Sequence, residues 1–325
     1  MKKIFLTGGT GLLGRSIISR ITEEDNYEII GLKRATSQLE GISEKVTWME
    51  GDLLDQAFIE AQVQQADLVI HCAAVVDFRP SRRKEILKTN VTSTAQIVDA
   101  CVEHNKRLIH ISSVAALGYP EKGKEVTENT DFQPDALNTD YAYSKYYSEM
   151  EVWRGFAEGL NGVVLNPSII IGKPAKWSDS TGSFWVSARK GLPFYTTGTT
   201  GFVDARDISD VVAGLLDSEI TGERFIMNSE NWSYRAFNNL VASSINAKPP
   251  KIKVTSLLGG LMWRTGWLIQ KVFRYQIPYT KALHQVASTT AHFSSEKAQR
   301  QLGARFRPVE ESIHWLSEQF LADEQ

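Results

Sequence analysis

The chain has 325 residues, of which 42% are hydrophobic and 23% charged, and its formal net charge is −2 at pH 7. This length exceeds that of a usual single domain, so we expect one larger domain with a smaller attached region. The near-neutral charge balance gives no sign of a nucleic-acid partner. The N-terminal apolar stretch, residues 4–6, is too short for a signal peptide, and the two cysteines are typical of free thiols in a reducing compartment. We therefore expect a cytoplasmic protein.

A short apolar strand opens the chain and leads into a glycine-rich turn. Residues 3–6 read KIFL and residues 7–14 read TGGTGLLG, after which apolar residues recur at helical spacing as far as Ile21. Glycines at this spacing allow a tight turn, a close backbone approach to a pyrophosphate, and close packing of the helix on its strand. The helix start also offers unpaired N–H groups to an anion. The pattern predicts a dinucleotide phosphate site made by Gly8, Thr10, Gly11, Leu12 and Leu13.

The second apolar run ends in two basic residues. Ile29 to Leu32 is followed by Lys33 and Arg34, about 20 residues past the glycine loop, where an NAD-preferring protein usually carries Asp or Glu for the ribose hydroxyls. An acidic group there would repel a 2′-phosphate, whereas Lys33 and Arg34 would attract one, and arginine can also stack on adenine. The sequence therefore predicts NADP(H) in preference to NAD(H). Two solvated charges at a strand end are the alternative.

Strands and helices alternate through the first half of the chain. Further short apolar runs lie at 46–49, 68–70, 108–111 and 163–165, and helical patterns fill most of the gaps between them. This alternation predicts an α/β fold, a doubly wound parallel sheet with helices on both faces and a cofactor crevice at the carboxyl ends of its strands. We expect a nucleotide-binding domain over 1–166 and a smaller, mostly helical substrate-binding region over 167–325. We expect residues 201–228 to return to the nucleotide-binding core.

Tyr141 and Lys145 are four residues apart, so on a helix they lie on one face. A nearby ammonium favours the phenolate and is expected to lower the pKa of the tyrosine toward a range useful for acid–base chemistry. The apolar run 108–111 ends in Ser112 and Ser113, which can place a hydroxyl beside that tyrosine at the carboxyl edge of the sheet. The pattern indicates a proton-transfer site, with a surface Tyr–Lys contact as the alternative.

Several motifs match one enzyme family in chain order. TGGTGLLG matches its TGxxGxxG, GDLLD at 51–55 matches its adenine-contacting GDL, HCAA at 71–74 matches its nicotinamide-ribose segment, and Asn90 matches the motif that opens its next long helix. Ser113, Tyr141 and Lys145 match its catalytic set, and GFVDARD at 201–207 matches a segment typical of its reductase branches. With these matches the chain resembles, over nearly its whole length, the extended short-chain dehydrogenase/reductases of the NAD-dependent epimerase/dehydratase superfamily. The resemblance implies a Rossmann-type fold. It extends the cofactor site to Asp52, Leu53, Ala73, Ala74, Tyr141, Lys145 and Pro167.

The same resemblance implies hydride transfer between the nicotinamide and a carbonyl carbon. In that scheme Tyr141 donates a proton to the forming alkoxide, Ser113 hydrogen-bonds the same oxygen, and Lys145 holds the nicotinamide ribose. Counting back from Gly118 favours Ser113 over Ser112.

The substrate class follows from departures within the family pattern. Enzymes that act on nucleotide sugars usually carry Arg-Pro where this chain carries Asn166 and Pro167. The chain is therefore most similar to the dihydroflavonol 4-reductase and 3β-hydroxysteroid dehydrogenase-like branch. This similarity implies an NADPH-dependent reductase for a ketone or aldehyde of a small apolar or aromatic substrate. One alternative is a nucleotide-sugar epimerase or dehydratase with bound NAD, and a second is a non-catalytic, NADP-binding regulatory protein.

Two further segments carry unassigned patterns. The basic loop 77–84, DFRPSRRK, could meet an acidic substrate or could be only a solvated loop. An apolar stripe over 256–273 is interrupted by Arg264 and Lys271, which excludes a membrane span. It could form a core helix, a lid over an apolar pocket, or a helix resting on a membrane surface. We expect no metal site. The helices near Asn90 and Tyr141 are those that many relatives pair in dimers, so a homodimer would form through them.

Overall fold

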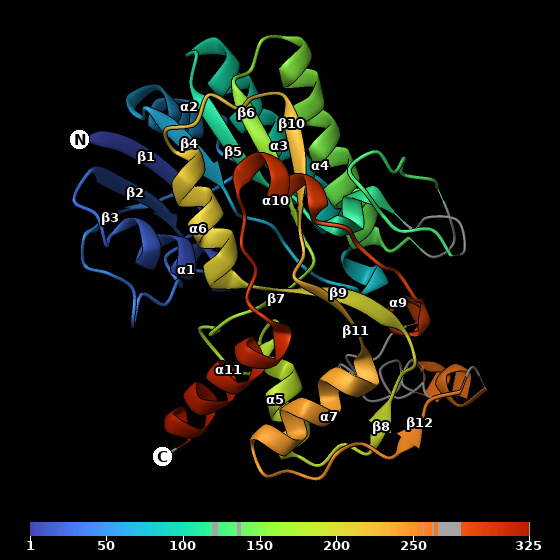
Figure 1. Ribbon diagram of the computed structural model, residues 1–325. Coiled ribbons are helices and arrows are strands. Elements are labelled where there is room, and N and C mark those ends of the chain that lie inside the picture. Colours follow the sequence, from blue (N-terminus) through green and yellow to red (C-terminus); the bar gives the residue numbers. More distant parts are fainter. Residues whose placement is uncertain (119–122, 135–137, 256, 262, 266–280, 325) are drawn as a thin grey trace.

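The computed structural model describes residues 1–118, 123–134, 138–255, 257–261, 263–265 and 281–324. A seven-stranded parallel sheet forms the centre of this part of the chain (Figure 1). Its strands occur in the order β10-β6-β5-β4-β1-β2-β3. This order confirms the predicted Rossmann-type sheet, because it winds outward in both directions from β1. The strands are β1 (Lys2–Thr7), β2 (Tyr27–Lys33), β3 (Val46–Glu50), β4 (Leu68–His71), β5 (Arg107–Ile111), β6 (Gly162–Pro167) and β10 (Glu223–Met227).

Helices cover both faces of this sheet, as the alternating pattern predicts. Ile4 and Leu6 of β1 pack in the core on one face, and Phe5 packs in the core on the other, because successive side chains of a strand point to opposite faces. The first face is covered by α1 (Leu12–Ile21), α6 (Ala205–Leu215) and α10 (Glu296–Leu302). The second face is covered by α2 (Gln56–Gln65), α3 (Arg83–Glu103) and α4 (Asp140–Ala157).

A second region lies beyond the carboxyl ends of the strands (Figure 1). It has its own aromatic core, in which the rings of Phe202 and Phe237 stack with centroids 4.2 Å apart and buried Trp185 donates to Ser317 Oγ at 2.8 Å. This core is separate from the two cores that flank the sheet. The elements are β7 (Ile169–Ile171), α5 (Gly182–Arg189), β8 (Phe194–Tyr195), β9 (Thr199–Asp204), β11 (Glu230–Ser233), α7 (Tyr234–Ser244), β12 (Ile252–Lys253), α9 (Lys281–Ser288) and α11 (Val309–Asp323).

The chain passes from β9 of the second region into α6, which packs on the sheet. Asp204 caps α6 by accepting from the backbone N–H of Arg206 at 2.8 Å. The Arg206 guanidinium pairs with the Asp204 carboxylate and lies 4.1 Å from the ring centroid of Trp315 in α11. Asp207 accepts from the backbone N–H of Arg307 at 2.8 Å. The GFVDARD segment therefore fastens α6 to the segment that begins α11.

Much of the 256–273 stripe lies outside the described residues, because these omit 256, 262 and 266–273. Residues 257–261 and 263–265 are helical, and the side chains of Leu257 and Leu261 are exposed. In the described part of the chain every helix is too short or too polar to cross a bilayer.

Candidate active site

The glycine loop after β1 is shaped by two close backbone approaches. Gly8 has a φ of +76°, and a Cβ there would lie 2.6 Å from the backbone nitrogen of Ala73. A Cβ at Gly14 would lie 2.2 Å from the Gly8 carbonyl oxygen. The loop therefore touches the segment that follows β4 and also the first turn of α1. Helix α1 starts at Gly11 with no side-chain cap, which leaves first-turn N–H groups for an anion. A pyrophosphate fits this cradle.

The other predicted cofactor residues also lie along the carboxyl edge of the sheet. Asp52 and Leu53 follow β3, Ala73 and Ala74 follow β4, and Pro167 ends β6. Asp52 Oδ1 accepts from the backbone N–H of Leu54 at 2.9 Å, which fixes the turn after β3. The structure thus brings the predicted positions to one edge, which is the place where a doubly wound sheet binds a dinucleotide.

The two basic residues after β2 have different surroundings. The Lys33 ammonium lies 3.1 Å from a carboxylate oxygen of Glu50, its register partner on β3. Arg34 is exposed, and its guanidinium makes no ion pair with any other residue that the structure describes. Arg34 is therefore more available than Lys33 to bind a phosphate.

Arg15 organises the loop beside Arg34, and the sequence motifs gave no signal for it. Its Nε donates to the Thr10 carbonyl at 3.0 Å, and its two terminal nitrogens donate to the carbonyls of Gln38 and Glu40 at 2.6 Å each. The side chain thus joins the glycine loop to the loop that follows β2.

Ser113, Tyr141 and Lys145 lie together where β5 ends against α4. Ser113 begins the short 3-10 helix η2 (Val114–Leu117), and its hydroxyl shares a hydrogen bond with that of Tyr141. Lys145 is 3% exposed and donates from Nζ to the Ile111 carbonyl at 2.9 Å. Ser112 instead donates to Glu149 Oε2 at 2.6 Å. The serine that faces the tyrosine is therefore Ser113.

Burial dominates the protonation of this group. It raises the pKa of Tyr141, and the hydrogen bond from Ser113 only partly opposes that effect. It lowers the pKa of Lys145 to about 8, against the opposing influence of Cys72 and Glu149. The expectation that the pKa of Tyr141 is lowered by Lys145 is therefore wrong for this structure, because loss of hydration raises that pKa and only the hydrogen bond from Ser113 opposes the rise. Tyr141 is a neutral phenol near pH 7, which is the form that can donate a proton.

Two buried histidines lie in register beneath the site, His71 on β4 and His110 on β5, with ring centroids 5.3 Å apart. The ring nitrogens of His71 pair with the hydroxyls of Thr7 at 2.7 Å and Thr94 at 3.1 Å. Burial lowers the pKa of His71 to about 3 and also lowers that of His110. Both rings are therefore neutral at physiological pH.

Asn90 does not open a helix, contrary to the family motif, because α3 already begins at Arg83. Its Oδ1 accepts from the Val75 N–H at 2.7 Å, and its Nδ2 donates to the Val75 carbonyl and to Ser144 Oγ, each at 3.0 Å. Asn90 therefore holds the segment after β4 against α4.

Acidic side chains pair with the three arginines of the basic loop 77–84. Asp77 pairs with both Arg79 and Arg82, Glu85 also pairs with Arg82, and Asp140 pairs with Arg83. Between these residues, the ring of Phe78 meets that of Tyr141 edge-on with centroids 5.7 Å apart. The loop thus contributes an aromatic wall beside Tyr141.

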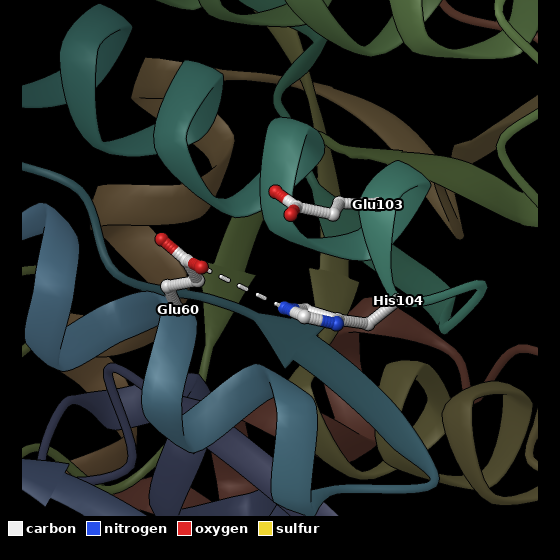
Figure 2. A group of neighbouring side chains, drawn as sticks. All are labelled: Glu60, Glu103 and His104. Carbon is white, nitrogen blue, oxygen red and sulfur yellow. Dashed lines mark ion pairs between the residues drawn. The ribbon is translucent and has the colours of Figure 1, made fainter.

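A separate group of titratable side chains joins α2 to the end of α3 (Figure 2). Nε2 of His104 lies 3.9 Å from Oε1 of Glu60, and one ligand atom from each of Glu60, Glu103 and His104 lies within 4.8 Å of the others. One imidazole and two carboxylates are a set that divalent metals accept. However, Glu103 is exposed, and exposed acidic groups in such an arrangement are common without a metal ion.

The chain is similar to known proteins both in sequence and in fold. Residues 4–225 match the NAD dependent epimerase/dehydratase family. A putative dihydroflavonol 4-reductase from Synechocystis sp. is 26% identical over 96% of this chain and 94% of its own length. Sterol demethylase protein B from Methylococcus capsulatus is 26% identical over 70% of this chain and 69% of its own length. The crystal structure of UDP-glucose 4-epimerase from Thermotoga maritima has the same fold, with a TM-score of 0.81, 16% identity, and coverage of 99% of this chain and 100% of the other.

The chain therefore belongs to the NAD-dependent epimerase/dehydratase family, which confirms the resemblance seen in the sequence. Members of this family are NAD(P)-dependent oxidoreductases, epimerases and dehydratases, so the protein is an enzyme that uses a nicotinamide cofactor.

Proposed function

We propose that the protein is an NADPH-dependent reductase that acts on a ketone or aldehyde of a small apolar or aromatic substrate. The observation that carries this proposal is a half-buried, neutral Tyr141 that hydrogen-bonds Ser113 and packs edge-on against Phe78. A proton donor beside an aromatic wall suits an apolar carbonyl compound. Similarity to a putative dihydroflavonol 4-reductase along 96% of the chain supports the same branch.

The chemistry of the proposal divides between cofactor and protein. NADPH, when bound, supplies the hydride that reduces the carbonyl carbon. Tyr141 donates its proton to the carbonyl oxygen as negative charge develops there. Ser113 donates a hydrogen bond to the same oxygen, and because its backbone is held at the end of β5 it needs little reorganisation to do so. The Lys145 ammonium holds the nicotinamide ribose.

The preference for NADPH rests on Arg34. Its free guanidinium follows β2, where the adenine ribose lies in this fold, and it can bind a 2′-phosphate with paired hydrogen bonds. Lys33 contributes less, because Glu50 already pairs with it.

The experiment that tests this function is an absorbance assay of NADPH oxidation with a panel of aromatic and aliphatic ketones and aldehydes. Identification of the nucleotide released on denaturation should accompany it. We expect turnover with at least one aromatic carbonyl compound, faster with NADPH than with NADH. Tightly bound NAD⁺ near one per chain, with no carbonyl turnover, would instead identify a redox-neutral epimerase or dehydratase.

A further inference from the structure

The catalytic set proposed above is divided between two elements. Tyr141 and Lys145 lie on α4, whereas Ser113 follows β5. A hydrogen bond between Tyr141 and Ser113 therefore requires the end of β5 to be held at a fixed position along α4.

Glu149 joins these two elements. It lies on α4 one turn beyond Lys145, on the same face, and is 2% exposed. Its Oε2 accepts from Ser112 Oγ at 2.6 Å and from Asn166 Nδ2 at 2.7 Å. The same Asn166 nitrogen also donates to the Ser113 carbonyl at 3.0 Å. The carboxylate thus binds the residue before Ser113 directly and the backbone of Ser113 through Asn166.

The second carboxylate oxygen of Glu149 also accepts two hydrogen bonds. Oε1 accepts from Nη1 of Arg224 on β10 at 3.0 Å and from Nε1 of Trp153 at 3.3 Å. Arg224 is itself held by the carbonyls of Glu128 at 2.8 Å and Thr130 at 3.2 Å. Four donors, one directly after β5, one each on β6 and β10, and one on α4, therefore converge on one buried carboxylate. Such a group is costly to bury unless all its partners are in place, so it specifies a single arrangement of those elements.

We propose that Glu149 is a positioning residue that holds the end of β5, and with it Ser113, in register with Tyr141 and Lys145. Its effect on turnover rests on the proposed function, whereas the register that it sets is a property of the fold. Replacing the carboxylate with the glutamine amide keeps one acceptor oxygen and turns the other into an NH2 group, so two of the four donors lose their acceptor. Ser113 then moves relative to Tyr141, and the carbonyl oxygen loses one of its two donors.

The charge of Glu149 also acts on Lys145. The titratable groups that face the ammonium are His71 and Cys72 at the end of β4, His110 on β5, and Glu149 on its own helix. Both histidines are neutral, and burial raises the pKa of Cys72 to about 12. Cys72 and Glu149 both oppose the burial-induced lowering of the Lys145 pKa, so removing the charge of Glu149 should lower that pKa further.

Glu149→Gln tests the proposal, with Glu151→Gln as the matched control on the same helix, where the carboxylate pairs with Arg154 at the surface. We expect kcat/KM to fall roughly 10–100-fold in Glu149→Gln, with NADPH affinity at pH 7 within about twofold of wild type. The alkaline limb of kcat/KM should also move to lower pH, which loss of packing alone would not cause. Glu151→Gln should match wild type in both measurements. Wild-type kcat/KM with an unmoved alkaline limb in Glu149→Gln overturns the proposal.

Two further measurements decide the question if Glu149→Gln fails to fold or the wild type reduces no carbonyl compound. Ser112→Ala removes one donor and keeps the charge, so we expect kcat/KM to fall several-fold without any shift of the alkaline limb. A crystal structure of Ser112→Ala or Glu149→Gln needs no turnover. Displacement of Ser113 from Tyr141 supports the positioning role, and an unmoved Ser113 overturns it. Absence of turnover in the wild type counts only against the reductase function.

Discussion

At the β1 end of the carboxyl edge the cofactor cradle is made of backbone, whereas at the β5–β6 end the proposed acid–base site is made of side chains. The cradle depends on close approaches at Gly8 and Gly14 and on the uncapped start of α1. The acid–base site depends on the hydrogen bond between Ser113 and Tyr141, which come from separate elements, and on Lys145, whose ammonium donates to the Ile111 carbonyl. The cradle is therefore disrupted by adding atoms, and the acid–base site by removing a single functional group.

The largest effect on the cradle is expected from Gly8→Ala. The added Cβ would lie 2.6 Å from the Ala73 nitrogen, at a φ of +76° that already disfavours a side chain. We expect the free energy of unfolding to fall by about 3 kcal/mol or more and NADPH binding to be lost. Thermal denaturation and a fluorescence titration measure both.

Gly123→Ala is the matched control for this clash. Gly123 also has a positive φ, +86°, but a Cβ there would meet nothing within 4 Å. It should cost only about 1 kcal/mol and leave NADPH affinity unchanged. Equal losses in the two variants would mean that backbone strain, and not the contact with Ala73, accounts for the Gly8 effect.

Arg34→Ala should produce the next largest effect, and only on one cofactor. If Arg34 binds the 2′-phosphate, its loss should weaken NADPH binding by roughly 10–100-fold and leave NADH binding within about twofold. Lys33→Ala should have a smaller effect, because Glu50 already pairs with Lys33. Isothermal titration with each cofactor makes the comparison. A similar loss of affinity for NADPH and NADH would show that Arg34 does not bind the 2′-phosphate.

The smallest expected effect is a pH dependence at the acid–base end. Burial lowers the pKa of Lys145 to about 8, so its ammonium is present below that pH and is lost above it. Cofactor affinity should therefore be highest below about pH 8 and weaken as the pH rises further. Lys145→Met should have weaker affinity and no such break. A wild-type affinity that is flat from pH 6 to pH 10 would contradict the role given to the ammonium.

Sequence reasoning predicted the fold well because its signals are local. Buried parallel strands such as Leu68–His71 are continuous apolar runs, and the glycine loop needs only neighbouring residues to form its turn. The Tyr141–Lys145 spacing is likewise visible within one helix.

The same reasoning missed the features that arise from packing between distant segments. The role of Glu149 depends on its hydrogen bonds with Ser112, Asn166 and Arg224. These residues are distant from it in the sequence, and no helical or strand periodicity relates them to it. The raised pKa of Tyr141 follows from burial that only the assembled fold produces. Nor does a motif reveal that Arg15 bridges the two loops at the cofactor edge.

The most direct test of the central claim is to measure turnover and NADPH affinity in Tyr141→Phe. This change removes one hydroxyl from the side-chain end of the edge and leaves the backbone cradle intact. The account predicts that kcat/KM falls by roughly 10²–10⁴-fold while the NADPH dissociation constant stays within about twofold of wild type. Turnover at the wild-type rate in Tyr141→Phe would contradict the assignment of Tyr141 as the proton donor.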